Sequence, residues 1–149
     1  MPKTPLRQCV FLLTSVFLIV PGCSWNSDRV PVNHVIGSVF VAGQPASGAK
    51  LFFHPASDPT AQRALRPFAE VVPDGTFEVN TYFEGDGAPE GDYLVTIYWP
   101  APKKTPKGKF DDESVPPDRL KDIYSNPKTS KLRAHISKGD NTLEPFQLP

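Results

Sequence analysis

The chain has two cysteines and three histidines among 149 residues, and each scarcity argues against a class of function. Cys9 lies in the apolar N-terminal run, so a chain that loses this run keeps only Cys23 and cannot form an internal disulfide. His34, His54 and His135 stand singly, outside any H-x-x-x-H or H-x-x-E pattern of zinc enzymes. No G-x-S-x-G motif is present. We therefore expect a protein that is not an enzyme and uses no cofactor.

The sequence also lacks an excess of either charge and a long hydrophobic run. Sixteen basic residues balance sixteen acidic ones, which argues against a nucleic-acid partner. The longest uncharged apolar run, Cys9–Val20, has 12 residues, whereas a membrane-spanning helix needs about 20. The run predicts an export signal that is removed rather than a permanent membrane helix.

The N-terminus has the three regions of a signal peptide. Lys3 and Arg7 precede the apolar run, and Gly22 and Cys23 follow it. A small residue directly before such a cysteine resembles the lipobox of bacterial lipoproteins, in which the cysteine is acylated and becomes the new N-terminus. Acylation would use the one remaining thiol, and two or three acyl chains anchor a protein stably to a membrane. The alternative is an ordinary secretory signal followed by an incidental cysteine.

These observations predict a signal peptide over 1–22, a tether over 23–33 and one domain over 34–149. The predicted location is an exported, membrane-anchored lipoprotein of the outer membrane or the periplasmic face. Ser24, in place of the aspartate of retained lipoproteins, resembles the pattern of outer-membrane lipoproteins.

Beyond the tether, short runs of β-branched and aromatic residues alternate with period two between turn residues. We expect strands at 34–41, 49–54, 68–72, 76–82, 92–99, 132–136 and 142–148. The clearest hairpin joins the third and fourth of these runs through Pro73-Asp74-Gly75. Residues 100–130 are expected to form one long insertion loop. The predicted fold is all-β, a seven-stranded antiparallel β-sandwich of prealbumin-like or Ig-like type.

An ordered set of motifs resembles a known family. Gly37-Ser-Val-Phe-Val-Ala-Gly-Gln-Pro, Gly48-Ala-Lys-Leu-Phe-Phe, Asp74-Gly-Thr-Phe and Gly91-Asp-Tyr-Leu-Val occur in the order found in carboxypeptidase regulatory-like domains of prealbumin-like (transthyretin-like) fold. The match covers about residues 35–98. The resemblance implies a small accessory β-sandwich with no chemistry of its own, often attached to exported proteins.

Two groups of residues are candidate ligand sites. Glu84, Asp86, Glu90 and Asp92 lie within nine residues and could hold Ca²⁺, although a solvated acidic turn has the same composition. The aromatic side chains near the ends of predicted strands could stack on sugar rings or belong to the core. These aromatic residues are Tyr82, Tyr98 and Trp99.

A third candidate surface is the basic stretch within the insertion. Lys103, Lys104, Lys107 and Lys109 could meet anionic lipid or a cell-wall polymer, but the acidic residues 111–113 follow them directly and could compensate their charge.

The sequence therefore predicts a lipid-anchored envelope β-sandwich acting as a non-catalytic binding or structural module for an envelope protein or polysaccharide. The alternatives are a carbohydrate-binding module and a metal-dependent enzyme assembled from scattered histidines.

Overall fold

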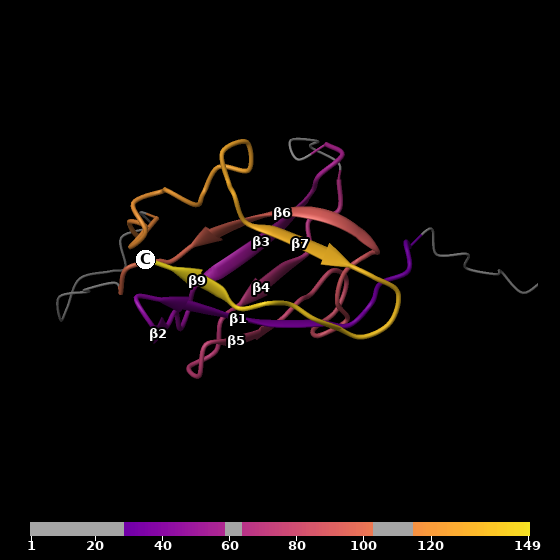
Figure 1. Cartoon of the computed structure of the whole chain (residues 1–149), viewed down its shortest axis with the longest axis horizontal. Helices are drawn as coiled ribbons and strands as arrows, with labels where there is room; N and C mark the ends of the chain where they lie inside the picture. The colour runs from indigo at the N-terminus through magenta and orange to yellow at the C-terminus, as the bar shows by residue number, and fades with distance from the viewer. Residues whose placement is uncertain (1–28, 59–63, 103–114) are drawn as a thin grey trace, which may run out of the picture.

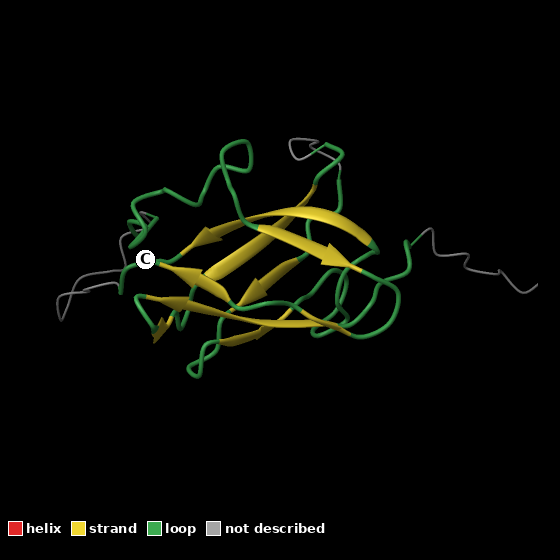
Figure 2. Cartoon of the chain, viewed as in Figure 1, coloured by secondary structure: helices red, strands yellow, loops and turns green. Residues whose placement is uncertain are grey.

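A computed structural model of the chain describes residues 29–58, 64–102 and 115–149. Within these ranges the chain forms nine strands and no helix (Figure 2). The strands are β1 (Val35–Val41), β2 (Gln44–Pro45), β3 (Lys50–Pro55), β4 (Phe68–Glu70), β5 (Thr76–Glu78), β6 (Gly91–Tyr98), β7 (Arg133–Ile136), β8 (Asn141–Thr142) and β9 (Phe146–Leu148). No helix in the described part of the chain is long and apolar enough to cross a bilayer.

Two sheets pack face to face as a sandwich (Figure 1). The four-stranded sheet has the order β4-β3-β6-β7 and is antiparallel throughout. The five-stranded sheet is built around β1, which pairs antiparallel with β2 and β5 and parallel with β8 and β9. The predicted all-β sandwich is confirmed in this form.

Two details of the predicted sandwich are wrong. The described residues form nine strands rather than seven, because β2 was not predicted and the single strand predicted over 142–148 is divided into β8 and β9. The sheets are not purely antiparallel, because the chain leaves β7 and crosses to the other sheet, where β8 and β9 arrive parallel to β1. Leu148 then pairs with Val41, so the C-terminus lies at the opposite end of the sandwich from Arg29 (Figure 1).

The core follows the predicted alternation. Val35 and Val39 of β1 and Leu51 and Phe53 of β3 are fully buried, as are the alternate residues of β6 from Tyr93 to Ile97. Phe77 of β5 lies at the centre, with its ring 6.4 Å from the rings of both Phe53 and Phe146. Hydrophobic burial between the two inner faces therefore holds the sandwich together.

The described part of the predicted insertion, residues 100–102 and 115–130, packs against the sheet. β7 covers only the first half of β6, and the backbone of the later residues of β6 is paired by the segment that follows residue 115. Ile97 donates its N–H group to the Tyr124 carbonyl at 3.0 Å, and the Val95 carbonyl accepts the hydroxyl of Ser130 at 2.5 Å. Leu120 is buried in the core. This part of the insertion therefore completes an edge that would otherwise leave backbone groups unpaired.

The last residues of the predicted tether are also attached to the domain. Asn33 and Ala88 exchange two backbone hydrogen bonds of 2.8 and 3.0 Å. Val30 donates its N–H to the Tyr82 hydroxyl at 3.1 Å. The end of the sandwich that contains Arg29 and these contacts is called the N-terminal end below.

Candidate functional site

The three aromatic residues proposed as a sugar-stacking surface do not lie together. Tyr82 lies at the N-terminal end beside Val30, whereas Tyr98 and Trp99 lie at the far end of β6, which begins near Ala88. The Tyr98 hydroxyl donates to the Pro116 carbonyl at 2.5 Å. The structure therefore divides this set between the two ends of the sandwich.

Trp99 is a core residue and offers no exposed ring face. It is 8% exposed, and the guanidinium carbon of Arg119 lies 3.4 Å from its ring centroid. Its indole N–H donates to the Ser47 carbonyl at 2.9 Å. The prediction of a stacking surface at Trp99 is wrong, because the segment after residue 115 folds back over the ring.

The four acidic residues proposed as a calcium site likewise do not form one group, because Asp86 and Asp92 have different partners. The carboxylate of Asp86 accepts the backbone N–H groups of Thr81, Tyr82 and Phe83 at 2.7 to 3.0 Å. Burial raises the pKa of Asp86, but the three N–H donors outweigh it and leave the pKa below its ordinary value. The carboxylate of Asp86 therefore stabilises the backbone of its own loop.

Asp92 has a different partner. Its carboxylate lies 2.7 Å from Nδ1 of His135. Of the other histidines, His54 makes a hydrogen bond of 2.9 Å between Nε2 and the Thr96 hydroxyl, and His34 lies 3.9 Å from Asp140. Within residues 29–58, 64–102 and 115–149, no three histidine, cysteine or acidic side chains form a group that could hold a metal ion.

The structure contains a feature that the sequence analysis did not predict, a hairpin that is open in the middle. β4 and β5 are the arms of the predicted hairpin, but β4 pairs with β3 and β5 pairs with β1, in different sheets. The arms are joined at the turn, where Val72 donates its N–H to the Thr76 carbonyl at 2.8 Å. They are joined again at the other end, where Phe68 and Asn80 exchange two hydrogen bonds of 2.9 and 2.8 Å.

Glu70 and Glu78 occupy corresponding positions on the two arms of the open part. Counting outward from the turn, this position lies midway between the two closed ends of the hairpin, and no backbone ladder joins β4 to β5 among the described residues. The backbone groups of Glu70 and Glu78 alternate with those that pair to β3 and β1, and therefore point into the gap.

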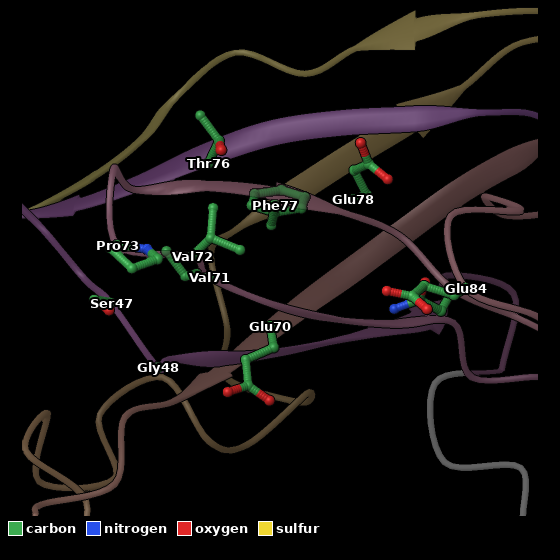
Figure 3. A pocket seen from close by; sticks show the side chains of 11 residues that line it. Ser47, Gly48, Glu70, Val71, Val72, Pro73, Thr76, Phe77, Glu78 and Glu84 are labelled. Carbon is green, nitrogen blue, oxygen red and sulfur yellow. The ribbon is translucent and has the colours of Figure 1, made fainter.

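The opening forms a groove of about 550 Å³ along the hairpin, called the β4–β5 groove. Figure 3 shows Glu70 and Glu78 on opposite sides of Val71 and Phe77, with Glu84 at the end away from Pro73. The lining residues include three glutamates and no lysine or arginine. The groove thus combines an apolar floor with acidic walls.

The three glutamates form no ion pair in the described part of the chain, although Glu70 lies opposite Lys50 of β3. All three side chains are exposed, and no ion pair of the described residues includes them. Glu78 lies close to Gly85, because a Cβ added at Gly85 would be 3.0 Å from its Oε2. The three carboxylates belong to three chain segments: β4, β5 and the loop that follows β5.

A shallower hollow of about 360 Å³ adjoins the groove at the N-terminal end and shares Glu70 and Glu84 with it. Phe68 and Phe83 line this hollow and are 48% and 63% exposed. Beside it, the guanidinium of Arg29 lies 5.0 Å from the ring centroid of Phe83 and 5.3 Å from that of Tyr82. These distances are within the range of cation–π attraction.

Cys23 and the lysines at 103–109 lie outside the described residues, so their predicted roles stay predictions. Glu70 and Glu78 were missed, although a sequence signal for them existed. Pairing residues outward from Pro73-Asp74-Gly75 sets these two glutamates opposite each other.

The chain has no match among protein-family models, and a search of curated proteins finds no similar sequence.

Proposed function

We propose that this chain is an exported, lipid-anchored β-sandwich that serves the cell envelope as a non-catalytic binding module. The observation that carries the proposal is the β4–β5 groove, an open groove between the two sheets whose glutamates form no ion pair among the described residues. Its volume lies in the range of ligand-binding clefts. The finer fold proposed is the prealbumin-like sandwich, on the motifs around Gly37, Asp74 and Gly91.

The proposed anchor is acylated Cys23, which supports a definite orientation of the domain. Five residues separate Cys23 from Arg29, which makes six Cα-to-Cα steps, so Arg29 can lie at most about 22 Å from the acylated residue. The guanidinium of Arg29 lies over the rings of Tyr82 and Phe83. The groove then begins near the membrane, at Glu84, and runs away from it toward Pro73.

The anchor is tested by cell fractionation and intact-mass measurement of the wild type and the Cys23→Ser variant. We expect the wild type in the membrane fraction, cleaved before residue 23 and heavier by the mass of its acyl groups. The variant should be free of membranes and unacylated. A wild-type chain of unmodified mass in the soluble fraction would refute the anchored part of the proposal.

A second candidate function, carbohydrate binding, is favoured by the shallow hollow next to the groove. The exposed rings of Phe68 and Phe83 lie beside Asn80 and Glu84, whose oxygen atoms could accept hydrogen bonds from sugar hydroxyls. This surface differs from the predicted one, which included Tyr98 and Trp99. Retention on immobilised polysaccharides, lost in a Phe68→Ala variant, would support it.

A further inference from the structure

We infer that the β4–β5 groove binds an extended basic segment of a partner protein, in which cationic and apolar side chains alternate. This inference rests on the proposed binding function of the groove and names the chemistry of its partner.

The first argument is charge complementarity. Glu70, Glu78 and Glu84 border the groove from three chain segments, and none forms an ion pair within the described residues, although Lys50 lies opposite Glu70 on β3. A lysine or arginine side chain from outside could approach each carboxylate without first breaking an existing ion pair. Exposed pairs of this kind each contribute little, so the recognition needs several of them together.

The second argument is the floor of the groove. Val71 and Phe77 lie between Glu70 and Glu78 and are themselves 2% exposed, while Val72 at the groove is 47% exposed. An extended chain presents alternate side chains to opposite faces. A segment with apolar residues toward Val72 and basic residues toward the walls therefore fits the groove better than a uniformly charged one.

The third argument is that the protein already holds a guanidinium at this end of the groove. Arg29 lies on the rings of Tyr82 and Phe83, and Phe83 also lines the hollow that continues the groove. Phe68 offers a second exposed ring in the same hollow. Because Arg29 already lies on the rings of Tyr82 and Phe83, a cationic side chain of the partner would lie on the ring of Phe68 or displace Arg29.

The fourth argument is the open position of the hairpin. The N–H and C=O groups of Glu70 and Glu78 point into the gap without forming a ladder between β4 and β5. Extended peptides bind to an unpaired strand edge through hydrogen bonds with its N–H and C=O groups.

The test uses the purified full-length protein in nonionic detergent and a fluorescent eight-residue peptide of alternating lysine and valine. Anisotropy gives the dissociation constant, and backbone amide shifts locate the binding. The groove variant combines three substitutions: Glu70→Gln, Glu78→Gln and Glu84→Gln. A matched control variant removes the same charge elsewhere: Glu90→Gln, Asp122→Asn and Glu144→Gln, all at exposed positions.

We expect the peptide to shift the amides of residues 70–72 and 76–78, and the groove variant to bind it about 5- to 30-fold more weakly. The control variant should bind within about twofold of the wild type. Thermal melts of both variants check that the fold is kept.

Three results would overturn the inference. The first is equal weakening in both variants, which would show attraction by net charge alone. The second is equal binding of a glutamate–valine peptide. The third is a shift of the groove amides by oligosaccharides or by a second copy of the chain but not by the basic peptide, in which case the groove binds a different ligand and the proposed function stands. Failure of the fractionation experiment at Cys23 would instead refute the anchor and leave this inference intact.

Discussion

Substitution of Gly37 by alanine tests the centre of the sandwich. Gly37 of β1 lies opposite Phe77 of β5, and its backbone has no positive φ, so its conformation does not oppose an alanine. A Cβ at this position would lie 2.5 Å from Cζ of Phe77 and 3.0 Å from Cε1, closer than real side chains approach. The ring cannot move freely, because Phe53 and Phe146 both contact it.

Two opposing terms give the expected magnitude. Replacing glycine by alanine at a compatible position stabilises by about 0.4–1 kcal/mol through the unfolded state. Inserting a methyl group into a packed core costs about 1–3 kcal/mol. We expect Gly37→Ala to lower the free energy of unfolding by about 1–2 kcal/mol, which corresponds to a fall in Tm of about 3–8 °C. Urea unfolding followed by circular dichroism measures the change.

A double-mutant cycle separates the contact from other effects of the methyl group. Phe77→Leu removes the ring atoms that the methyl group meets, and costs stability itself through the cavity that it leaves. In the Phe77→Leu background, Gly37→Ala should cost less than in the wild type by about 1 kcal/mol. A Gly37→Ala variant as stable as the wild type, or a cycle with no coupling, would refute the packing argument at this position.

Two further predictions concern a turn and the pH dependence of stability. Gly87→Ala should lower the free energy of unfolding by more than about 2 kcal/mol. Its Cβ would overlap the Asn33 carbonyl, and its φ of +88° lies in the left-handed region that alanine disfavours. Gly48→Ala, at a φ of +78° in open space, should cost clearly less in the same thermal melts, and equal losses would contradict the clash. Burial raises the pKa of Tyr93 to about 12, so its contribution to stability is complete below pH 10 and is lost as the pH rises from 10 to 12. Absorbance titration of tyrosinate should show one late-titrating group that Tyr93→Phe removes.

Much of the fold could be predicted because alternation is a local signal. The inward face of β1, the burial of Leu51 and Phe53, and the buried face of β6 all follow from period two. Strand partners could not be predicted in the same way. The parallel pairing of β1 with β9 joins residues more than 100 positions apart, and nothing in either strand specifies the other.

The candidate sites failed for the same reason wherever distant segments decide exposure. Trp99 is followed by proline and was expected near a strand end, but Arg119 covers its ring. Asp86 belongs to an acidic run, but the backbone of residues 81–83 uses its carboxylate. Composition alone therefore identified neither an exposed aromatic surface nor a metal site in these segments.

The β4–β5 groove arises from a conflict between local and distant interactions. The turn at 73–75 favours a regular hairpin, whereas the core favours β4 in one sheet and β5 in the other. Both interactions are satisfied at the turn and at the Phe68–Asn80 bridge, whereas between them, at Glu70 and Glu78, the two arms are not paired with each other. Glu70 lies opposite Lys50 of β3, and Glu78 lies opposite Ile36 of β1. Together with Glu84 they line the groove without forming an ion pair among the described residues. For this reason the groove, rather than the aromatic or acidic runs, is the surface to test first.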